Sequence, residues 1–156
     1  MLPIRTILHA TDFSASADYA FNLACALARD YHARLLVVHI RPLPTTMLWE
    51  GGYMPPGDEI RDEEERLRAL TPPAGVLVDY LLAEGVPDAE IVRLAAEHHC
   101  DLIVLGTHGR TGLGRLLMGS VAEMVVRKAP CPVLTIRHPL PQALVESEAA
   151  AQPAGV

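Results

Sequence analysis

Short apolar runs alternate along this chain with longer segments in which apolar residues recur at helical spacing. The apolar runs predict five strands, at residues 4–10, 34–40, 76–82, 101–106 and 132–137. The segments between them predict four helices, at about residues 14–32, 58–70, 89–98 and 120–128. Regular alternation of strand and helix is typical of βαβ units. We therefore predict an α/β fold in which helices cover both faces of a five-stranded parallel sheet.

The predicted helices have recognisable starts and inward faces. Ser14 or Ser16 could cap the first helix, and Asp88 is expected to cap the third. The acidic run at residues 63–65 of the second helix is most simply a solvated face. The inward residues expected on the second and third helices are Ile60, Leu67, Leu70, Ile91, Leu94 and Ala95.

Two segments fall outside this alternation. Proline and glycine are concentrated in residues 41–57, which predicts a long loop. Trp49 and Tyr53 in that loop could form a lid or a partner surface, and an ordinary packed loop is the alternative. Residues 139–156 are rich in Ala, Pro, Glu and Gln, a composition typical of a disordered tail. We therefore expect one folded domain at residues 1–138.

Composition narrows the function classes. Hydrophobic residues make up 50% of the chain and aromatic residues only 4%, which predicts an aliphatic core typical of parallel sheets. The net charge of −6 provides no general attraction for nucleic acid or an anionic membrane. Cys25, Cys100 and Cys131 lack CxxC spacing, which argues against a disulfide framework or a zinc site. No run is long enough to span a bilayer and no signal sequence is evident, so we expect a cytoplasmic protein.

The predicted topology indicates where a ligand would bind. Ligands of open α/β sheets bind beyond the carboxyl ends of the strands, where the strand order reverses. Two segments are expected at such ends: Ala10-Thr11-Asp12 after the first strand, and the segment that begins at Gly106 after the fourth. Because the protein is acidic, an anion site there would depend on backbone amides and a few basic groups.

The glycine-rich segment 106–120 has the composition of such an anion site. Glycine lets backbone amides approach an anion closely, and Gly119-Ser120 starts a helix whose free amides favour phosphate. Arg110 adds positive charge. The segment is neither a Walker A loop nor a dinucleotide fingerprint, because it lacks Gly-Lys-Ser/Thr and has Leu117 where a third glycine would stand. On pattern alone, a flexible turn between strand and helix is the alternative.

The spacing Gly106-x2-Gly109-x9-Gly119-Ser120 resembles the nucleotide-binding motif of the universal stress protein family. The resemblance extends over about residues 3–137 and implies a Rossmann-like fold of the adenine nucleotide alpha hydrolase type. The other segments that carry it are Ile7-Leu8-His9-Ala10-Thr11-Asp12-Phe13-Ser14, Leu36-Val37-Val38-His39-Ile40, Glu84-Gly85-Val86-Pro87 and Ala129-Pro130-Cys131-Pro132-Val133-Leu134.

The intact glycines make the chain similar to the ATP-binding branch of that family. The resemblance implies that Asp12 contacts the nucleoside, that the backbone at Ile40 reaches adenine, and that Gly106 lies by the ribose. Backbone amides around Gly109, Gly119, Ser120 and Val121 would surround the phosphates. Mg²⁺ could accompany ATP, held by phosphate oxygens and Asp12. The candidate site is Ala10, Thr11, Asp12, Ile40, Gly106, His108, Gly109, Arg110, Gly119, Ser120 and Val121.

Each candidate residue has a simpler interpretation. Asp12 could only cap the first helix, and His39 is expected to be packed rather than catalytic. A metal site at His98-His99-Cys100 is disfavoured because adjacent ligands do not converge easily on one ion. No nucleophile paired with a base is evident. We therefore expect a regulatory ATP-binding module in the stress response, with a slow ATPase or autophosphorylating enzyme, or an interaction protein with a vestigial loop, as alternatives.

The last predicted strand suggests a homodimer. Residues 132–137 would form a sheet edge without a lysine or an internal proline to prevent pairing with another strand. Universal stress proteins commonly dimerise through this strand, so the resemblance implies the same antiparallel pairing about a two-fold axis. The alternative is that the tail folds back over the edge, although Pro139 and Pro141 make it a poor strand.

Overall fold

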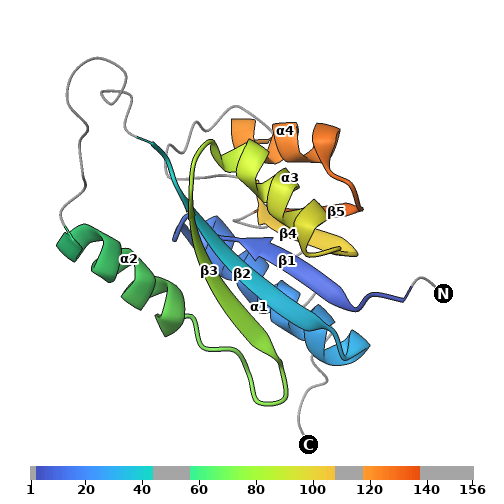
Figure 1. Ribbon diagram of the computed structural model, residues 1–156. Coiled ribbons are helices and arrows are strands. Elements are labelled where there is room, and N and C mark those ends of the chain that lie inside the picture. The colour runs from blue at the N-terminus through green and yellow to red at the C-terminus, as the bar shows by residue number, and fades with distance from the viewer. Residues whose placement is uncertain (1–2, 44–56, 108–117, 138–156) are drawn as a thin grey trace, which may run out of the picture.

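The computed structural model describes residues 3–43, 57–107 and 118–137. Strands and helices alternate along them (Figure 1). The strands are β1 (Thr6–Ala10), β2 (Arg34–Arg41), β3 (Val78–Glu84), β4 (Leu102–Gly106) and β5 (Val133–Ile136). The helices are α1 (Ala15–Tyr31), α2 (Gly57–Ala69), α3 (Pro87–Glu97) and α4 (Ser120–Lys128). No helix among these residues is long and apolar enough to cross a membrane.

All neighbouring strands are parallel, in the order β3-β2-β1-β4-β5. The predicted five-stranded parallel sheet is thus confirmed. From β1 the chain builds outward to β2 and β3, and then returns to the other side of β1 for β4 and β5. The strand order therefore reverses between β1 and β4, where Ala10 lies opposite Leu105 in the register. Strand β5 is an edge of the sheet that the described residues form, as predicted.

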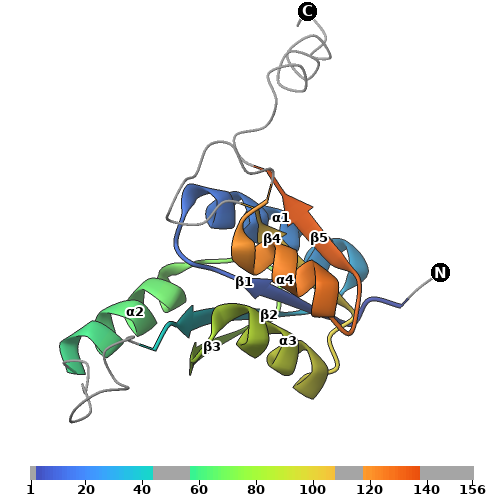
Figure 2. The ribbon, with the colours of Figure 1, turned by 90° about the horizontal axis from the view of Figure 1, so that it is seen from above.

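Helices cover both faces of the sheet. Because alternate strand residues point to opposite faces, the protein has two separate cores. Ile7 and Val37 belong to the core beneath α1 and α2, whereas Leu8 and Val38 belong to the core beneath α3 and α4. Figures 1 and 2 show α1 on one side of the sheet and the pair α3 and α4 on the other.

Helix α1 begins at a predicted cap. The Ser14 Oγ accepts a hydrogen bond from the Ala17 backbone N at 3.2 Å, which satisfies one of the unpaired amides of the first turn. The helix ends at His32, whose φ of 53° is left-handed. Small buried residues allow α1 to lie close to the sheet, namely Ala17, Ala20, Ala24 and Ala28.

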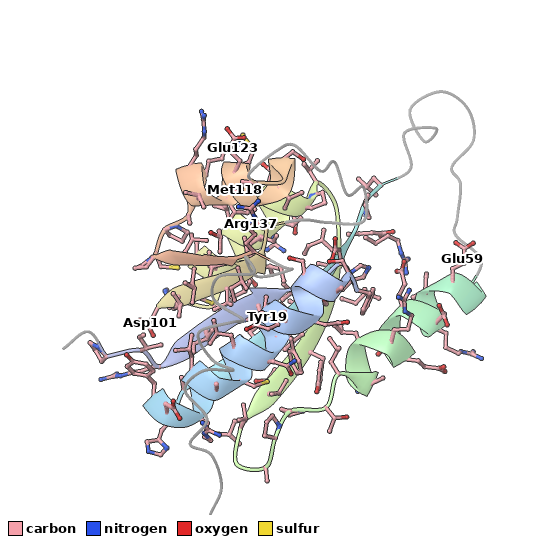
Figure 3. All side chains as sticks on the ribbon, turned by 180° about the vertical axis from the view of Figure 1, so that it is seen from behind. Tyr19, Glu59, Asp101, Met118, Glu123 and Arg137 are labelled. Carbon is pink, nitrogen blue, oxygen red and sulfur yellow. The ribbon has the colours of Figure 1, made fainter. Side chains whose placement is uncertain are left out.

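Asp101 connects the neighbouring strands β1 and β4 at their amino ends. Its Oδ2 accepts hydrogen bonds from the backbone N atoms of Arg5, at 2.8 Å, and Thr6, at 3.0 Å. Figure 3 shows Asp101 at the end of the sheet where β1 begins, with Tyr19 on α1 in front of the sheet. The start of β4 is thereby aligned with the start of β1, so that their carboxyl ends also meet at one edge.

The third strand is displaced from its predicted position. It runs from Val78 to Glu84 rather than over residues 76–82. The Val76 N donates to the Pro73 carbonyl at 3.4 Å in a turn before the strand, and Leu77 has 76% of its surface exposed. The apolar run therefore begins in the connection before β3, and hydrophobicity alone does not mark the start of the strand.

Helix α3 has a different cap from the one predicted. It begins at Pro87 with Val86 as its N-cap and without a capping hydrogen bond from a side chain. Proline suits the first turn because it has no N–H to leave unpaired there. Asp88 instead lies in that first turn, 3.7 Å from the Lys128 Nζ of α4. The predicted inward residues of α3 are buried, namely Ile91, Leu94 and Ala95.

Helix α2 is less buried than its pattern suggested. Leu67 is buried, and the Leu70 carbonyl after the helix accepts a hydrogen bond from the Tyr80 hydroxyl. The expectation that Ile60 faces the core is wrong, because its side chain is 36% exposed. Among the described side chains of α2, only Glu63 and Leu67 are not exposed. The helix is thus attached through a narrow face.

Candidate functional site

A cavity of about 350 Å³ opens at the carboxyl ends of β1, β2 and β4. It lies where the strand order reverses, which is the position expected for a ligand of an open α/β sheet. Strand ends, the turn after β1, and the first turns of α1, α3 and α4 line it. Elements far apart in the sequence therefore form one recess.

The cavity brings together predicted site residues from four parts of the chain. Those that line it are Ala10, Thr11, Asp12, Ile40, Gly106, Gly119, Ser120 and Val121. The other three predicted residues, His108, Gly109 and Arg110, lie outside the described residues. Thr107 and Gly119, which lie on either side of that part of the sequence, both line the cavity.

The turn after β1, residues 11–14, is held by hydrogen bonds to its own side chains. The Thr11 Oγ1 accepts from the Phe13 N, and the Asp12 Oδ1 accepts from the Ser14 N, both at 3.0 Å. The Thr11 N donates to the Val38 carbonyl at 2.9 Å, which joins the turn to β2. Asp12 is therefore a turn residue in the cavity wall. The alternative that it caps α1 is wrong, because Ser14 is the cap.

The N-terminus of α4 is directed at the cavity. Gly119 is its N-cap, with φ −69° and ψ 156° and no capping bond from a side chain, and Ser120 and Val121 form its first turn. The Gly119 N donates to the Thr107 carbonyl at 2.5 Å, which holds the start of α4 against the end of β4. The amides of a first turn and the helix dipole together favour an anion.

Gly106 is required by packing as well as by its place in the cavity wall. A Cβ atom at this position would lie 2.5 Å from the Ser16 Oγ and 2.8 Å from the Ser16 backbone C. Real Cβ atoms do not come so close, so the first turn of α1 can rest on the end of β4 only if residue 106 is glycine. Ser16 also donates from Oγ to the Ile136 carbonyl at 3.4 Å. No local sequence pattern indicated this second requirement for glycine.

The cavity also has an apolar wall that we did not predict. Its members come from the first turns of helices and from strand ends, namely Ala17, Pro42, Pro87, Ile91, Leu105 and Ala122. Pro87 belongs to a sequence segment that matched the family pattern, but no role in the site was predicted for it. In a parallel βαβ unit each helix starts near the carboxyl end of the preceding strand. The first turns of α1, α3 and α4 could therefore have been included from the sequence.

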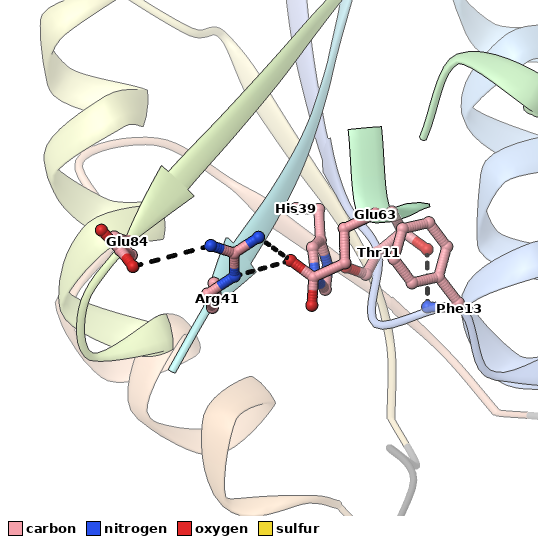
Figure 4. Close-up of polar contacts among 6 residues, drawn as sticks. All are labelled: Thr11, Phe13, His39, Arg41, Glu63 and Glu84. Atoms are coloured by element: carbon pink, nitrogen blue, oxygen red, sulfur yellow. Dashed lines mark hydrogen bonds and ion pairs between the residues drawn. The ribbon is translucent and has the colours of Figure 1, made fainter. Parts of the chain in front are cut away.

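His39 is buried, as expected, and it links the site to α2. Its Nδ1 donates to the Thr11 carbonyl at 2.8 Å, and its Nε2 lies 3.9 Å from the Glu63 Oε1 of α2. Glu63 is half-buried and accepts from the Arg41 Nε at 2.7 Å (Figure 4). The expectation that residues 63–65 form only a solvated face is thus wrong for Glu63. No role was predicted from the sequence for Arg41, the ion-pair partner of Glu63.

His9 is a fully buried histidine beneath the turn. Its Nδ1 is 3.0 Å from the Val104 carbonyl, and its Nε2 has no hydrogen-bond partner within the described structure. Burial lowers the pKa of His9 to about 4, although the bond to Val104 and the charge of Asp12 act in the opposite direction. His9 is therefore neutral at physiological pH, and the Nδ1 carries the proton that Val104 accepts.

The thiols of Cys25 and Cys100 are protonated at neutral pH. Burial raises the pKa of the Cys25 thiol to about 11 and that of the Cys100 thiol to about 12, so neither is a thiolate at neutral pH. Among the described residues, no three His, Cys, Asp or Glu side chains are grouped to hold a metal ion.

Comparison with known proteins identifies the family. The model of the universal stress protein family matches residues 3–137. The chain belongs to the universal stress protein family. A universal stress protein of Methanocaldococcus jannaschii is 37% identical over 127 residues, which cover 80% of this chain and 74% of that protein. One of Thermus aquaticus is 38% identical over 139 residues, which cover 85% and 98%.

Solved universal stress protein structures share the fold. UspA from Lactobacillus plantarum superposes with a TM-score of 0.67 at 27% identity, over 88% of this chain and all (100%) of that one. The Archaeoglobus fulgidus protein in complex with dAMP has a TM-score of 0.61 at 27% identity, over 87% and 99%. A universal stress protein in complex with cAMP has a TM-score of 0.60 at 25% identity, over 86% and 98%.

Proposed function

We propose that this universal stress protein binds ATP in the cavity and acts as a nucleotide-dependent regulatory module in the stress response. The observation that carries this proposal is the meeting of the Asp12 turn and the α4 N-terminus in one cavity at the reversal of strand order. Two relatives of the same fold have been solved with cAMP and with dAMP. These complexes support an adenine nucleotide as the ligand.

The phosphates are assigned to the N-terminus of α4. Backbone amides of Ser120 and Val121 would donate to phosphate oxygens, and the Ser120 hydroxyl adds a further donor. Gly119, whose own N–H donates to Thr107, would let the phosphates approach closely because it has no side chain. The sequence pattern assigns His108, Gly109 and Arg110 to the same phosphates. The hydrogen bond from Gly119 to Thr107 supports this role, because it fixes the direction of the first turn before a ligand arrives.

The nucleoside is assigned to the ends of β1, β2 and β4. Asp12 would accept hydrogen bonds from the nucleoside, Gly106 would lie by the ribose, and the backbone at Ile40 would reach adenine. Apolar residues around Pro42 and Ile91 suit the faces of a purine, because aromatic bases need a desolvated surface. Ala10 and Thr11 complete this side of the cavity.

Mg²⁺ fits this set of donors as a companion of ATP. Magnesium prefers oxygen ligands and is commonly held by one or two carboxylates together with substrate phosphates. Asp12 contributes a carboxylate to the same cavity that the N-terminus of α4 lines. Bound Mg²⁺ would neutralise phosphate charge, and the protein's own part is to orient the nucleotide between Asp12 and α4.

Two other functions make different predictions. An ATPase or autophosphorylating enzyme should release phosphate or modify itself. Turnover of about 1 per second or faster would favour an enzyme over a binding module with at most slow hydrolysis. An interaction protein with a vestigial loop should be unaffected by nucleotide in both stability and assembly. The high thiol pKa values of Cys25 and Cys100 remove two nucleophiles from the enzyme alternative.

The test is to identify and titrate the ligand. Mass spectrometry of the small molecules released from denatured protein should find ATP or another adenine nucleotide. Calorimetry with Mg²⁺ should then show saturable binding of ATP and much weaker binding of GTP. Absence of binding by every adenine nucleotide would refute the proposal.

We also propose a homodimer through β5. The Ile103 N donates to the Pro132 carbonyl and the Thr107 N to the Ile136 carbonyl, so the even residues of β5 face β4. Because strand residues alternate, the backbone groups of Val133 and Thr135 face outward, where a second β5 could pair with them. An antiparallel pair about a two-fold axis satisfies these groups in both copies.

A further inference from the structure

Helix α2 reaches the candidate site through three side chains, Glu63, Arg66 and Leu67, which we call the α2 contact face. Residues three and four apart lie on the same side of a helix. Leu67 is buried in the core beneath α1, whereas Glu63 and Arg66 contact residues at the carboxyl ends of β1 and β2. The helix is therefore attached partly to the core and partly to the walls of the cavity.

Arg66 contacts the turn that contains Asp12. Its Cζ lies 4.3 Å from the centre of the Phe13 ring, and His39 is a further neighbour of that ring, at 4.4 Å between centroids. Phe13 has a φ of 61°, a left-handed conformation that a bulky residue adopts only where its surroundings impose it. The contacts of this ring with Arg66 and His39 are such surroundings.

Glu63 contacts the same turn from a second direction. Its Oε2 accepts from Arg41, which also lies 3.7 Å from Glu84 at the end of β3 (Figure 4). Its Oε1 lies 3.9 Å from the His39 Nε2. The opposite ring nitrogen of His39 donates to the Thr11 carbonyl, directly before Asp12 in the chain. A continuous series of contacts thus joins α2 to the backbone of the site.

We propose that His39 and Phe13 are positioning residues through which α2 holds the Asp12 turn, so that nucleotide binding and the docking of α2 are coupled. The coupling rests on the proposed nucleotide site. It is reciprocal, because a nucleotide that binds better when α2 is docked must also stabilise the docked helix. The exposed surface of α2 then changes with occupancy of the site, which provides a way to signal the bound state.

The first experiment compares Glu63→Ala with Glu64→Ala. Glu64 pairs with Arg68 on the exposed side of the same helix at 2.8 Å, so its variant removes an acidic side chain and an ion pair without touching the turn. Calorimetry should show ATP affinity reduced about fivefold or more in Glu63→Ala and unchanged in Glu64→Ala. Equal affinity in both variants and the unmodified protein would overturn the coupling.

The second experiment separates positioning by His39 from simple packing. Asparagine at this position keeps an amide donor near the place of the histidine Nδ1, whereas leucine keeps bulk but cannot donate to Thr11. We expect His39→Asn to retain most of the ATP affinity and His39→Leu to lose about fivefold or more. The same loss in both variants would mean that the histidine ring only fills space.

Hydrogen exchange tests the coupling even without a ligand. In the nucleotide-free proteins, the amides of Phe13 and Ser14 should exchange faster in Glu63→Ala than in Glu64→Ala. If the unmodified protein binds no nucleotide, the proposed function fails while this comparison still decides whether α2 holds the turn. If it does bind, saturating ATP should slow exchange in α2 residues 61–69. Unchanged exchange there would overturn the proposal.

Discussion

The first turn of α1 rests on Gly106 so closely that a Cβ atom there would lie 2.5 Å from the Ser16 Oγ. Glycine at this position joins two requirements. It ends the interior strand β4 in the wall of the cavity, and it lets the helix that follows the Asp12 turn begin there. We therefore expect a substitution at Gly106 to alter both the fold and the site. A substitution at Gly119 should alter the site and leave the fold intact.

Gly106→Ala should destabilise the protein. The new methyl group would overlap backbone atoms of Ser16 at 2.8 and 2.9 Å, and backbone cannot move aside as a flexible side chain would. We expect the free energy of unfolding to fall by about 1–3 kcal/mol, as for overpacking elsewhere. Urea denaturation followed by circular dichroism measures it. A Gly106→Ala protein as stable as the unmodified one would contradict the observed packing.

Gly119→Val should instead reduce ATP affinity in a folded protein. The backbone of Gly119 (φ −69°, ψ 156°) is one that residues with side chains adopt readily. A β-branched side chain at the start of α4 would nevertheless occupy the space assigned to phosphate. We expect affinity to fall about tenfold or more, equivalent to about 1.4 kcal/mol. Unchanged calorimetric affinity in a variant with native circular dichroism would mean that the phosphates lie elsewhere.

His9 should make stability depend on pH. Burial lowers its pKa from 6.5 to about 4 in the folded state, so its stabilising contribution is complete above pH 6.5. Below that pH the unfolded chain binds a proton that the folded chain does not, and stability falls until about pH 4. The full loss is about 3 kcal/mol.

Urea denaturation between pH 7.5 and 4.5 measures this dependence. His9→Leu should flatten the curve between pH 6.5 and 5, because leucine does not titrate. His32→Asn is the matched control, since this position is exposed and asparagine tolerates its left-handed backbone. A slope that survives in His9→Leu would assign the pH dependence to other groups.

Thr135→Pro should convert the proposed dimer into a monomer. The N–H of Thr135 faces away from β4, so proline there removes an outward donor and leaves the pairing of β4 with β5 intact. Thr135→Val keeps that donor and should remain dimeric. Light scattering at micromolar concentration distinguishes the two. A monomeric unmodified protein would contradict the dimer through β5.

The sequence predicted the sheet well because its strands are buried on both faces. Runs such as 34–40 and 101–106 have few polar residues, and both became central or near-central strands. The start of α4 at Ser120 was also predicted correctly, since Gly-Ser marks a helix start. Strand β3 was displaced because it is an edge strand whose hydrophobic pattern is weaker.

The parts that the sequence could not predict depend on partners distant in the chain. Glu63 looks like any other member of an acidic run, and it is half-buried only because Arg41 of another element lies beside it. The packing role of Gly106 likewise depends on Ser16, which no local pattern connects to it. Such contacts form only in the assembled fold, so local sequence patterns do not predict them.

The hydrogen bond between Gly119 and Thr107 has a consequence for how this protein can diverge. It joins the two ends of the intervening segment at one point of the fold, so the helix start keeps its place whatever lies between. Lengthening such a closed segment has a small entropic cost, about 0.6 kcal/mol for each doubling. Met118 packs against the core beneath α3 and α4 and has to be kept. We therefore expect that the sequence between Thr107 and Met118 can be replaced without moving the start of α4, which offers a route to new ligand preferences on the same scaffold.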